Sequence, residues 1–340
     1  MSQEVLANIM FGIIGLAYFL YMVQEIPTIG VGIFNIFIAK NDEDKKKLQS
    51  IAGLYSDGIE VWLIAAVGLT FAAFPEAFGE IYSGIYVAAF LLLIAIIFRG
   101  LSVELMFKDD HPKWIKNMSL AWSISGMLLM FVLGVYFVTL FMGFPYENKT
   151  MDMNVLSIFN TASVSGGLLF IALGFIIGAV WMKFNKLNEL ADRAFIFIKK
   201  YGIIYFIPLL FALVLMGINN NVVSLVTCQF FSEFSWLFAV PIASLIFFAL
   251  VTLFAHFKLT PFLYVSYVLG LFTFFLTGFL GTFPYVLFSK EAFSESLSIV
   301  QVMSSEMSLT VLFVVIIIIL PIVLMYQGHK YIYFLRKDKH

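Results

Sequence analysis

The sequence is poor in charge, in histidine and in cysteine. Lysine, arginine, aspartate and glutamate together make up only 12% of its 340 residues, about half the share that is typical of soluble globular proteins. A chain that is also 62% hydrophobic cannot fold as a soluble domain. The single Cys228 excludes an intrachain disulfide and a metal site built from cysteine pairs. These shortages indicate a protein of the lipid bilayer.

Chemical motifs are equally scarce. No phosphate-binding loop, dinucleotide fingerprint or nucleophile elbow occurs in a usable context. Of the histidines, His111, His329 and His340 fall in predicted loops or the tail, and His256 lies at the end of a predicted span. A haem needs axial ligands on facing helices, which this arrangement does not supply. We therefore expect no cofactor in this chain and no nucleic-acid partner, and we expect its function to lie in the membrane, at its surface or on a partner.

Long apolar stretches are what the sequence has in abundance. Nine of them are long enough to cross a bilayer, which takes roughly 17 to 25 helical residues. They are continuously apolar rather than alternating, so they predict helices and not the strands of a β-barrel. The fold class is therefore an all-α polytopic membrane protein. The predicted spans are residues 8–35, 53–74, 81–98, 118–143, 158–182, 201–218, 234–255, 260–283 and 308–327.

The basic residues sort to one side of these predicted spans. Every lysine and arginine falls on that side except Lys149 and Lys290. Because lysine and arginine favour cytoplasmic loops, the N-terminus is predicted to lie outside and the C-terminus in the cytoplasm. The first residues lack the basic region of a signal peptide, so we expect an uncleaved first span in a bacterial inner membrane.

The first predicted span contains an acid, which is costly in hydrocarbon. A charged side chain there costs at least about 2.5–3.5 kcal/mol. Glu25 lies well inside the span and is followed by Pro27, which should kink the helix and free the carbonyls one turn earlier. Gly30 and Gly32 come next, and should let another backbone approach closely.

Further charges lie at the ends of the second and third spans. Asp57 and Glu60 are three residues apart, which places both carboxylates on one helical face. Arg99 closes the third span, and Glu104 follows it. The predicted topology brings Glu25, these two acids and Arg99 to one depth and one side of the membrane. Such crowded carboxylates suit a proton uptake site, and they equally suit a structural ion pair with Arg99.

Two segments near residue 60 carry a resemblance to a known family. Residues 56–63 read S-D-G-I-E-V-W-L and residues 71–75 read F-A-A-F-P. They resemble W-D-G-N-E-V-W-L and F-A-A-F-P in the second helix of subunit II of the cytochrome bd quinol oxidases. Residues 98–100, F-R-G, are similar to that family's L-R-G, and residues 281–285, G-T-F-P-Y, to the exit of its eighth helix. Spans five to seven match mainly by hydropathy.

The resemblance implies a nine-helix membrane subunit with two four-helix bundles and one peripheral helix. We expect these over residues 1–143, 144–285 and 286–340, the last comprising an external loop, the ninth helix and a cytoplasmic tail. The resemblance implies as partner a haem-bearing subunit I, which holds haems b and d, oxidises quinol and reduces dioxygen to water. This chain would be its non-haem partner and would be needed for assembly. Membrane lipids, a small single-helix subunit and a quinone held as a structural lipid are further expected partners.

The resemblance also implies a role for the acids in the first three helices. In the family, the aspartate of W-D-G-N-E-V-W-L lies on a hydrophilic proton route from the cytoplasm, and this role transfers to Asp57. The proposed neighbours on the route are Glu60, Glu25 and Glu104, with Arg99 as their charge partner.

The sequence departs from the family at three positions of this route. The family's first helix reads D-G-F-D-L-G-V-G, whereas residues 25–32 here read E-I-P-T-I-G-V-G, so Thr28 replaces the second acid. Ser56 stands where the family has tryptophan, and Ile59 where it has asparagine. We expect these changes to remove polar groups from the route.

The residues alone leave two other functions open. A proton-coupled transporter of a small solute would use helix breaks such as Pro27, Pro208, Pro241 and Pro261 to expose backbone at the bilayer midplane. Against it, the polar groups are expected at one face of the bundle rather than at mid-depth. A pure scaffold would use its acids only to pair with Arg99.

Overall fold

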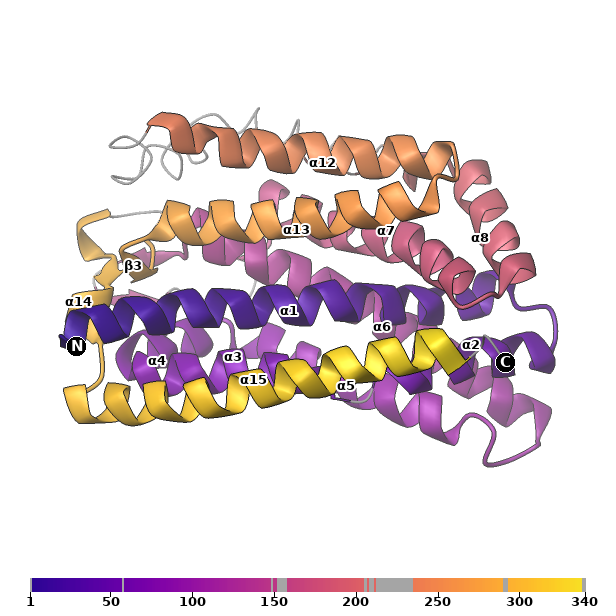
Figure 1. Ribbon diagram of the computed structural model, residues 1–340, viewed down its shortest axis with the longest axis horizontal. Helices are drawn as coiled ribbons and strands as arrows, with labels where there is room; N and C mark the ends of the chain where they lie inside the picture. Colours follow the sequence, from indigo (N-terminus) through magenta and orange to yellow (C-terminus); the bar gives the residue numbers. More distant parts are fainter. Residues whose placement is uncertain are drawn as a thin grey trace.

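The computed structural model describes residues 2–56, 58–147, 149–151, 158–204, 207, 211, 235–289 and 293–337, and this part of the chain is mostly helical (Figure 1). Eight of the described helices are long and apolar enough to cross a bilayer. The long elements are α1 (Gln3–Ile38), α2 (Asp42–Ser56) with α3 (Glu60–Ala73), α5 (Tyr86–Leu105), α6 (Pro112–Met142), α7 (Thr161–Phe184), α12 (Ala239–His256), α13 (Thr260–Thr282) and α15 (Glu306–Lys337).

The short elements lie between these spans. They are α4 (Pro75–Gly84), α8 (Asn188–Lys200), α14 (Ile299–Val302), the 3-10 turns Ser235–Phe238 and Phe293–Glu295, and the strands β1 (Tyr146–Glu147), β2 (Thr150–Met151), β3 (Tyr285–Leu287) and β4 (Leu297–Ser298). The strands form two antiparallel hairpins, β1–β2 and β3–β4. The β3–β4 hairpin and α14 lie at the end of the molecule where α1 begins (Figure 1).

Eight of the nine predicted spans coincide with these helices. Most of the sixth, residues 201–218, falls outside the described residues, as do Cys228 and Pro208. The third predicted span, 81–98, is divided between α4 and α5.

The helix that contains the second predicted span begins earlier than expected. It starts at Asp42 rather than near residue 53, and it is interrupted between α2 and α3. Acidic residues stabilise a helix N-terminus, and Lys45 and Lys47 pair with Asp42 and Glu43 one turn away, at 3.0 and 2.6 Å. These local charge pairs extend the helix into a segment that hydropathy assigns to a loop.

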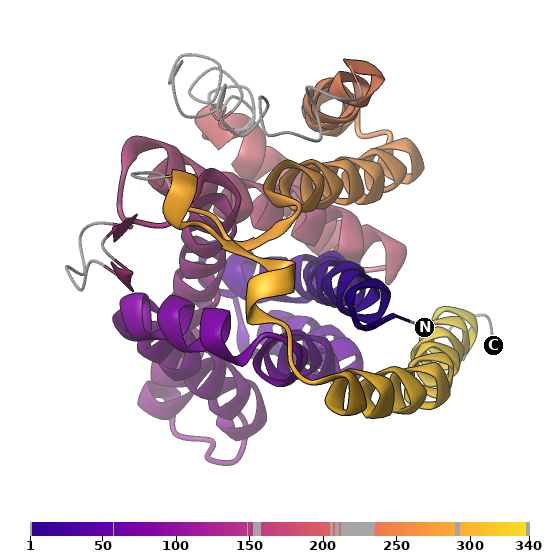
Figure 2. The ribbon, with the colours of Figure 1, turned by 90° about the vertical axis from the view of Figure 1, so that its left-hand side faces the viewer.

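Helix α1 is the central element of the described structure. It contacts α3, α6, α7, α13 and α15 along its length, and the end-on view shows it surrounded by its neighbours (Figure 2). Helix α15 lies at the periphery, and most of its side chains are exposed.

Glycines allow α1 to lie this close to α7. A Cβ atom on Gly30 would lie 2.1 Å from the carbonyl oxygen of Gly174, and one on Gly178 would lie 2.4 Å from the carbonyl carbon of Gly30. No real Cβ tolerates such distances, so the two backbones touch, as in small-residue contacts between membrane helices. The expectation that Gly30 admits another backbone is confirmed. Gly32 instead faces the indole ring of Trp122.

This contact predicts that Gly30→Ala destabilises the protein by about 1–3 kcal/mol, because the added methyl group would force α1 and α7 apart. The measurement is the midpoint of thermal unfolding in detergent. Gly12→Ala in the same helix is the matched control, since a Cβ there meets nothing within 4 Å. Equal midpoints for the two variants would contradict the close contact.

Candidate functional site

The site begins at the interruption between α2 and α3. Gly58 has a positive φ of 77°, a conformation that glycine adopts without strain and that commonly ends a helix. The N–H of Ile59 turns back to the carbonyl of Ser56 at 3.2 Å, and that of Trp62 bonds to the carbonyl of Ile59 at 3.1 Å. Asp57 falls within this interruption but outside the described residues. The interruption leaves Ser56 at the end of one helix and Glu60 at the start of the next.

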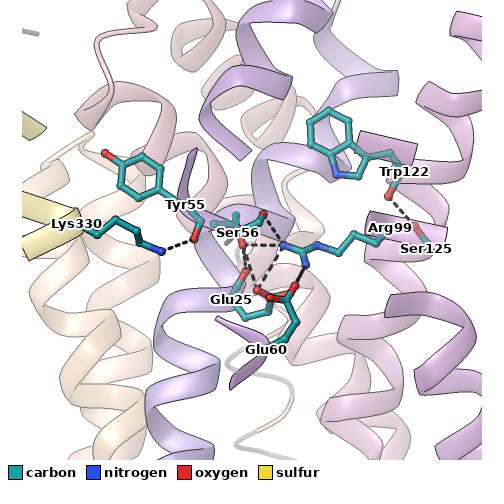
Figure 3. A network of polar contacts seen from close by, with 9 residues as sticks. Glu25, Tyr55, Ser56, Glu60, Arg99, Trp122, Ser125 and Lys330 are labelled. Carbon is teal, nitrogen blue, oxygen red and sulfur yellow. Dashed lines mark hydrogen bonds and ion pairs between the residues drawn. The ribbon is translucent and has the colours of Figure 1, made fainter. Parts of the chain in front are cut away.

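Both of these residues reach Arg99, which projects from α5 and is only 3% exposed (Figure 3). Arg99 Nη1 lies 2.8 Å from Glu60 Oε1, and Arg99 Nη2 donates to Ser56 Oγ at 2.8 Å. A guanidinium carries five N–H donors in a fixed plane, so it can hold several acceptors at once. Arg99 uses this capacity to join α5 to both sides of the interruption.

Glu25 binds the same guanidinium from α1. Its Oε1 lies 3.0 Å from Arg99 Nη1, in ion-pair contact, and its Oε2 accepts from Arg99 Nη2 at 3.4 Å. The Glu25 side chain is 1% exposed, whereas that of Glu60 is 33% exposed. We call Glu25, Ser56, Glu60 and Arg99 the Arg99 cluster. With both acids ionised its net charge is −1, so it can accept one proton and keep an ion pair.

Tyr267 supports the segment of α1 that carries Glu25. Pro27 has no N–H to bond the carbonyl of Val23, which a regular helix would require. The Tyr267 hydroxyl, from α13, donates to the carbonyls of Met22 and Val23 at 3.1 and 3.2 Å. Helix α1 therefore continues through Pro27. The role of Tyr267 was not predicted. The sequence does show a tyrosine inside a predicted span, and a proline in another span leaves a carbonyl that needs a hydrogen-bond donor.

Gln327 and Lys330 support the interruption itself, and the sequence analysis missed their role. Gln327 Nε2 donates to the carbonyl of Gly58 at 2.8 Å, and Lys330 Nζ donates to the carbonyl of Tyr55 at 3.1 Å. Lys330 follows the predicted last span, 308–327, whereas α15 continues past it to Lys337 and leaves it only 8% exposed.

The structure thus brings together Glu25, Glu60 and Arg99 from three predicted spans. Glu104 is different: it is exposed near the end of α5 and pairs with no charged group among the described residues. Thr28 and Ser56, which we expect to remove polar groups from the route, still place hydroxyl groups beside Arg99. The Ser56 hydroxyl accepts a hydrogen bond from Arg99, and the Thr28 hydroxyl lies 3.4 Å from both Arg99 Nη2 and Glu25 Oε2.

Comparison with known proteins places the chain in a family. The model of the family "cytochrome bd terminal oxidase subunit II" matches residues 6–334. The chain belongs to this family. Subunit 2 of the cytochrome bd ubiquinol oxidase of Bacillus subtilis is 28% identical over 92% of this chain and 90% of that protein. Subunit 2 of the Escherichia coli cytochrome bd-I ubiquinol oxidase is 25% identical over 97% of this chain and 94% of that protein.

A solved structure has the same fold. It is a chain of the bd oxidase from Geobacillus thermodenitrificans, with a TM-score of 0.71 and 16% sequence identity, covering 98% of this chain and 99% of that one. The resemblance found in the sequence is therefore confirmed. The chain is a multi-pass protein of the bacterial inner membrane. The relatives are named as subunits of ubiquinol oxidases. A transporter function is not favoured. Within the described residues, no group of three His, Cys, Asp or Glu side chains could hold a metal ion.

The shared guanidinium makes Arg99 the most sensitive position of the site. We predict that Arg99→Gln lowers stability by about 3–5 kcal/mol, because it leaves the buried Glu25 carboxylate unpaired. The double variant Arg99→Gln/Glu25→Gln should recover part of this loss, since it also removes the stranded charge. Thermal unfolding of the purified complex measures both.

Lys258→Gln is the matched control for that comparison. Lys258 pairs with Asp192 at 3.1 Å, and solvent screens this pair because the two side chains are 48% and 62% exposed. We expect an effect of about 1 kcal/mol or less. A double variant less stable than Arg99→Gln alone would contradict the arrangement described for Glu25.

Proposed function

We propose that this chain is the non-haem subunit of a cytochrome bd-type quinol oxidase. In such a complex the partner, subunit I, carries haems b and d, oxidises quinol and reduces dioxygen to water. The proposal rests on the family match over residues 6–334 and on relatives named as subunit 2 of cytochrome bd ubiquinol oxidases. The chain has no expected activity of its own and serves the assembly of the complex.

The proposed topology has nine spans, with the N-terminus outside and the C-terminus in the cytoplasm. It comprises a first bundle over 1–143, a second over 144–285, and the external loop, ninth helix and tail over 286–340. Support comes from the agreement of eight described helices with the predicted spans and from the one-sided distribution of lysine and arginine. The peripheral place of α15 suits the helix outside the two bundles.

The Arg99 cluster supports a second proposal, that this subunit delivers protons from the cytoplasm. The observation that carries it is the sharing of one guanidinium by two carboxylates, that of Glu60, which is one-third exposed, and that of Glu25, which is buried. Glu60 is accessible enough to take a proton from water, and Glu25 lies on the same guanidinium inside the bundle. Arginine remains charged throughout, so a proton moves between the two carboxylates while Arg99 balances the remaining negative charge.

The polar groups on either side extend this route. Asp57 precedes Glu60 by three residues and is the proposed first proton acceptor. The family resemblance implies that it lies on the route. Glu104 lies outside the Arg99 cluster and is exposed. Its proposed role is therefore limited to that of an acid at the cytoplasmic entrance of the route. One turn beyond Glu25, the Tyr21 hydroxyl is buried without a hydrogen-bond partner among the described residues. Buried polar groups of this kind are commonly satisfied by water, which suits a hydrated route.

A quinone held as a structural lipid is a third proposal. A groove of about 290 Å³ lies between α1, α3 and α15 and is lined almost wholly by apolar side chains. Trp62 lines it, and its buried indole N–H has no partner among the described residues. A groove lined in this way suits the isoprenoid chain of a quinone. Lipids on the outer faces and a small single-helix subunit rest on the family resemblance alone.

Purification through this chain tests the oxidase proposal. We expect a co-purifying membrane subunit of similar size and a reduced-minus-oxidised visible spectrum with the red absorbance of haem d. A colourless preparation without a partner would contradict it, and solute uptake in proteoliposomes would then test the transporter.

Charge removal at Glu60 tests the proton route. Glu60→Gln keeps the size and a hydrogen-bonding oxygen but cannot bind and release a proton, so turnover and proton uptake per haem d should fall about tenfold or more. Asp57→Asn should act in the same direction. Glu43→Gln, with a 73% exposed side chain on α2, is the control.

The same variants separate proton delivery from a pure scaffold. A scaffold predicts that Glu60→Gln and Asp57→Asn lower the yield of complex while each assembled complex turns over normally. Unchanged turnover and proton uptake per haem d would therefore overturn the proton route and leave the scaffold.

A further inference from the structure

Helix α15 exposes most of its length but buries two polar side chains. Gln327 is 5% exposed and Lys330 is 8% exposed, whereas Met325 beside them is 67% exposed. Residues three apart share one helical face, so both point toward the bundle. Burying an ammonium group in a membrane helix is costly unless it is paired. The position of Lys330 therefore requires a specific partner.

The partners of Lys330 and Gln327 are two backbone carbonyls that lose their usual helical N–H donors at the interruption. In a continuous helix the N–H of Ile59 would bond to the carbonyl of Tyr55, and that of Trp62 to the carbonyl of Gly58. Here both N–H groups bond one carbonyl further on, to Ser56 and Ile59.

Lys330 donates to the carbonyl of Tyr55 at 3.1 Å (Figure 3). Gln327 donates to the carbonyl of Gly58 at 2.8 Å. One face of α15 thus replaces two helical hydrogen bonds.

The interruption lies between two residues that bind Arg99. Ser56 ends α2 and Glu60 begins α3, and both contact the guanidinium at 2.8 Å. If α2 and α3 formed one regular helix, positions 56 and 60 would lie one turn apart, with about 6 Å between their Cβ atoms. Here two backbone hydrogen bonds of this turn are shifted, and Lys330 and Gln327 bind the carbonyls that the shift leaves without their helical partners.

We propose that Gln327 and Lys330 are positioning residues for proton uptake, which hold the α2–α3 interruption so that Ser56 and Glu60 both bind Arg99. This inference rests on the proposed proton route. It assigns the peripheral last helix a function in the route although α15 supplies no group that carries the proton. It also explains why a lysine lies buried in a helix whose other faces are apolar and exposed.

The test compares Lys330→Met and Gln327→Leu with Met325→Leu, all in the assembled complex. Hydrogen exchange of the amides from residue 55 to 60 reports on the interruption, and turnover per haem d reports on proton delivery. We expect exchange about tenfold faster and turnover about tenfold slower in the first two variants, since each loses a buried hydrogen bond. Met325→Leu should match the wild type in both measurements.

Two further variants separate positioning from general stability. Lys330→Arg keeps a cationic donor and should restore most of the turnover that Lys330→Met loses. Lys330→Met combined with Glu60→Gln should turn over no more slowly than Glu60→Gln alone, because both changes act on one step.

Unchanged exchange over residues 55–60 would overturn the proposal, and so would faster exchange with normal turnover. Failure of the proton route is recognised separately, because Glu60→Gln alone would then turn over like the wild type.

Discussion

One buried guanidinium holds together the part of this bd subunit that is suited to chemistry. Arg99 is 3% exposed and meets Glu25 from α1 and Glu60 from α3 within 3.0 Å. Taking these charges out of water costs several kcal/mol per ion unless the geometry pairs them well. The helices that carry Arg99, Glu25 and Glu60 must therefore hold these side chains within contact distance of one another. Several packing contacts of the bundle serve this requirement.

Three contacts between helices meet this requirement. Tyr267 bonds the carbonyls that Pro27 leaves on α1, so the helix carrying Glu25 stays continuous. The contact of Gly30 with the backbone of α7 fixes the depth of α1 in the bundle. Gln327 and Lys330 bond the carbonyls at the α2–α3 interruption. In the first and third cases, a distant residue binds carbonyls that have lost their helical N–H partners.

The sequence predicted the features that depend on composition and spacing. Continuous apolar stretches gave eight of the described spans, and the cost of burying charge singled out Glu25 and Arg99. It could not predict the early start of α2, which depends on local charge pairs, or the positions of Tyr267 and Lys330 opposite particular carbonyls. Those contacts depend on the rotation and depth of packed helices, which hydropathy does not encode. The contribution of Ser56 was also not predicted. Serine in place of the family's tryptophan was expected to remove a polar group, whereas its hydroxyl binds Arg99.

In the proposed proton route, the carboxylates of the Arg99 cluster bind and release protons as the oxidase works. The most direct test is an infrared difference spectrum of the assembled complex between its oxidised and reduced states, in the region of protonated carboxyl groups. Proton binding by the cluster predicts a band that Glu60→Gln or Glu25→Gln removes and that the exposed Glu43→Gln leaves in place. Spectra that are identical for the wild type and all three variants would contradict it and leave the cluster with a structural role only.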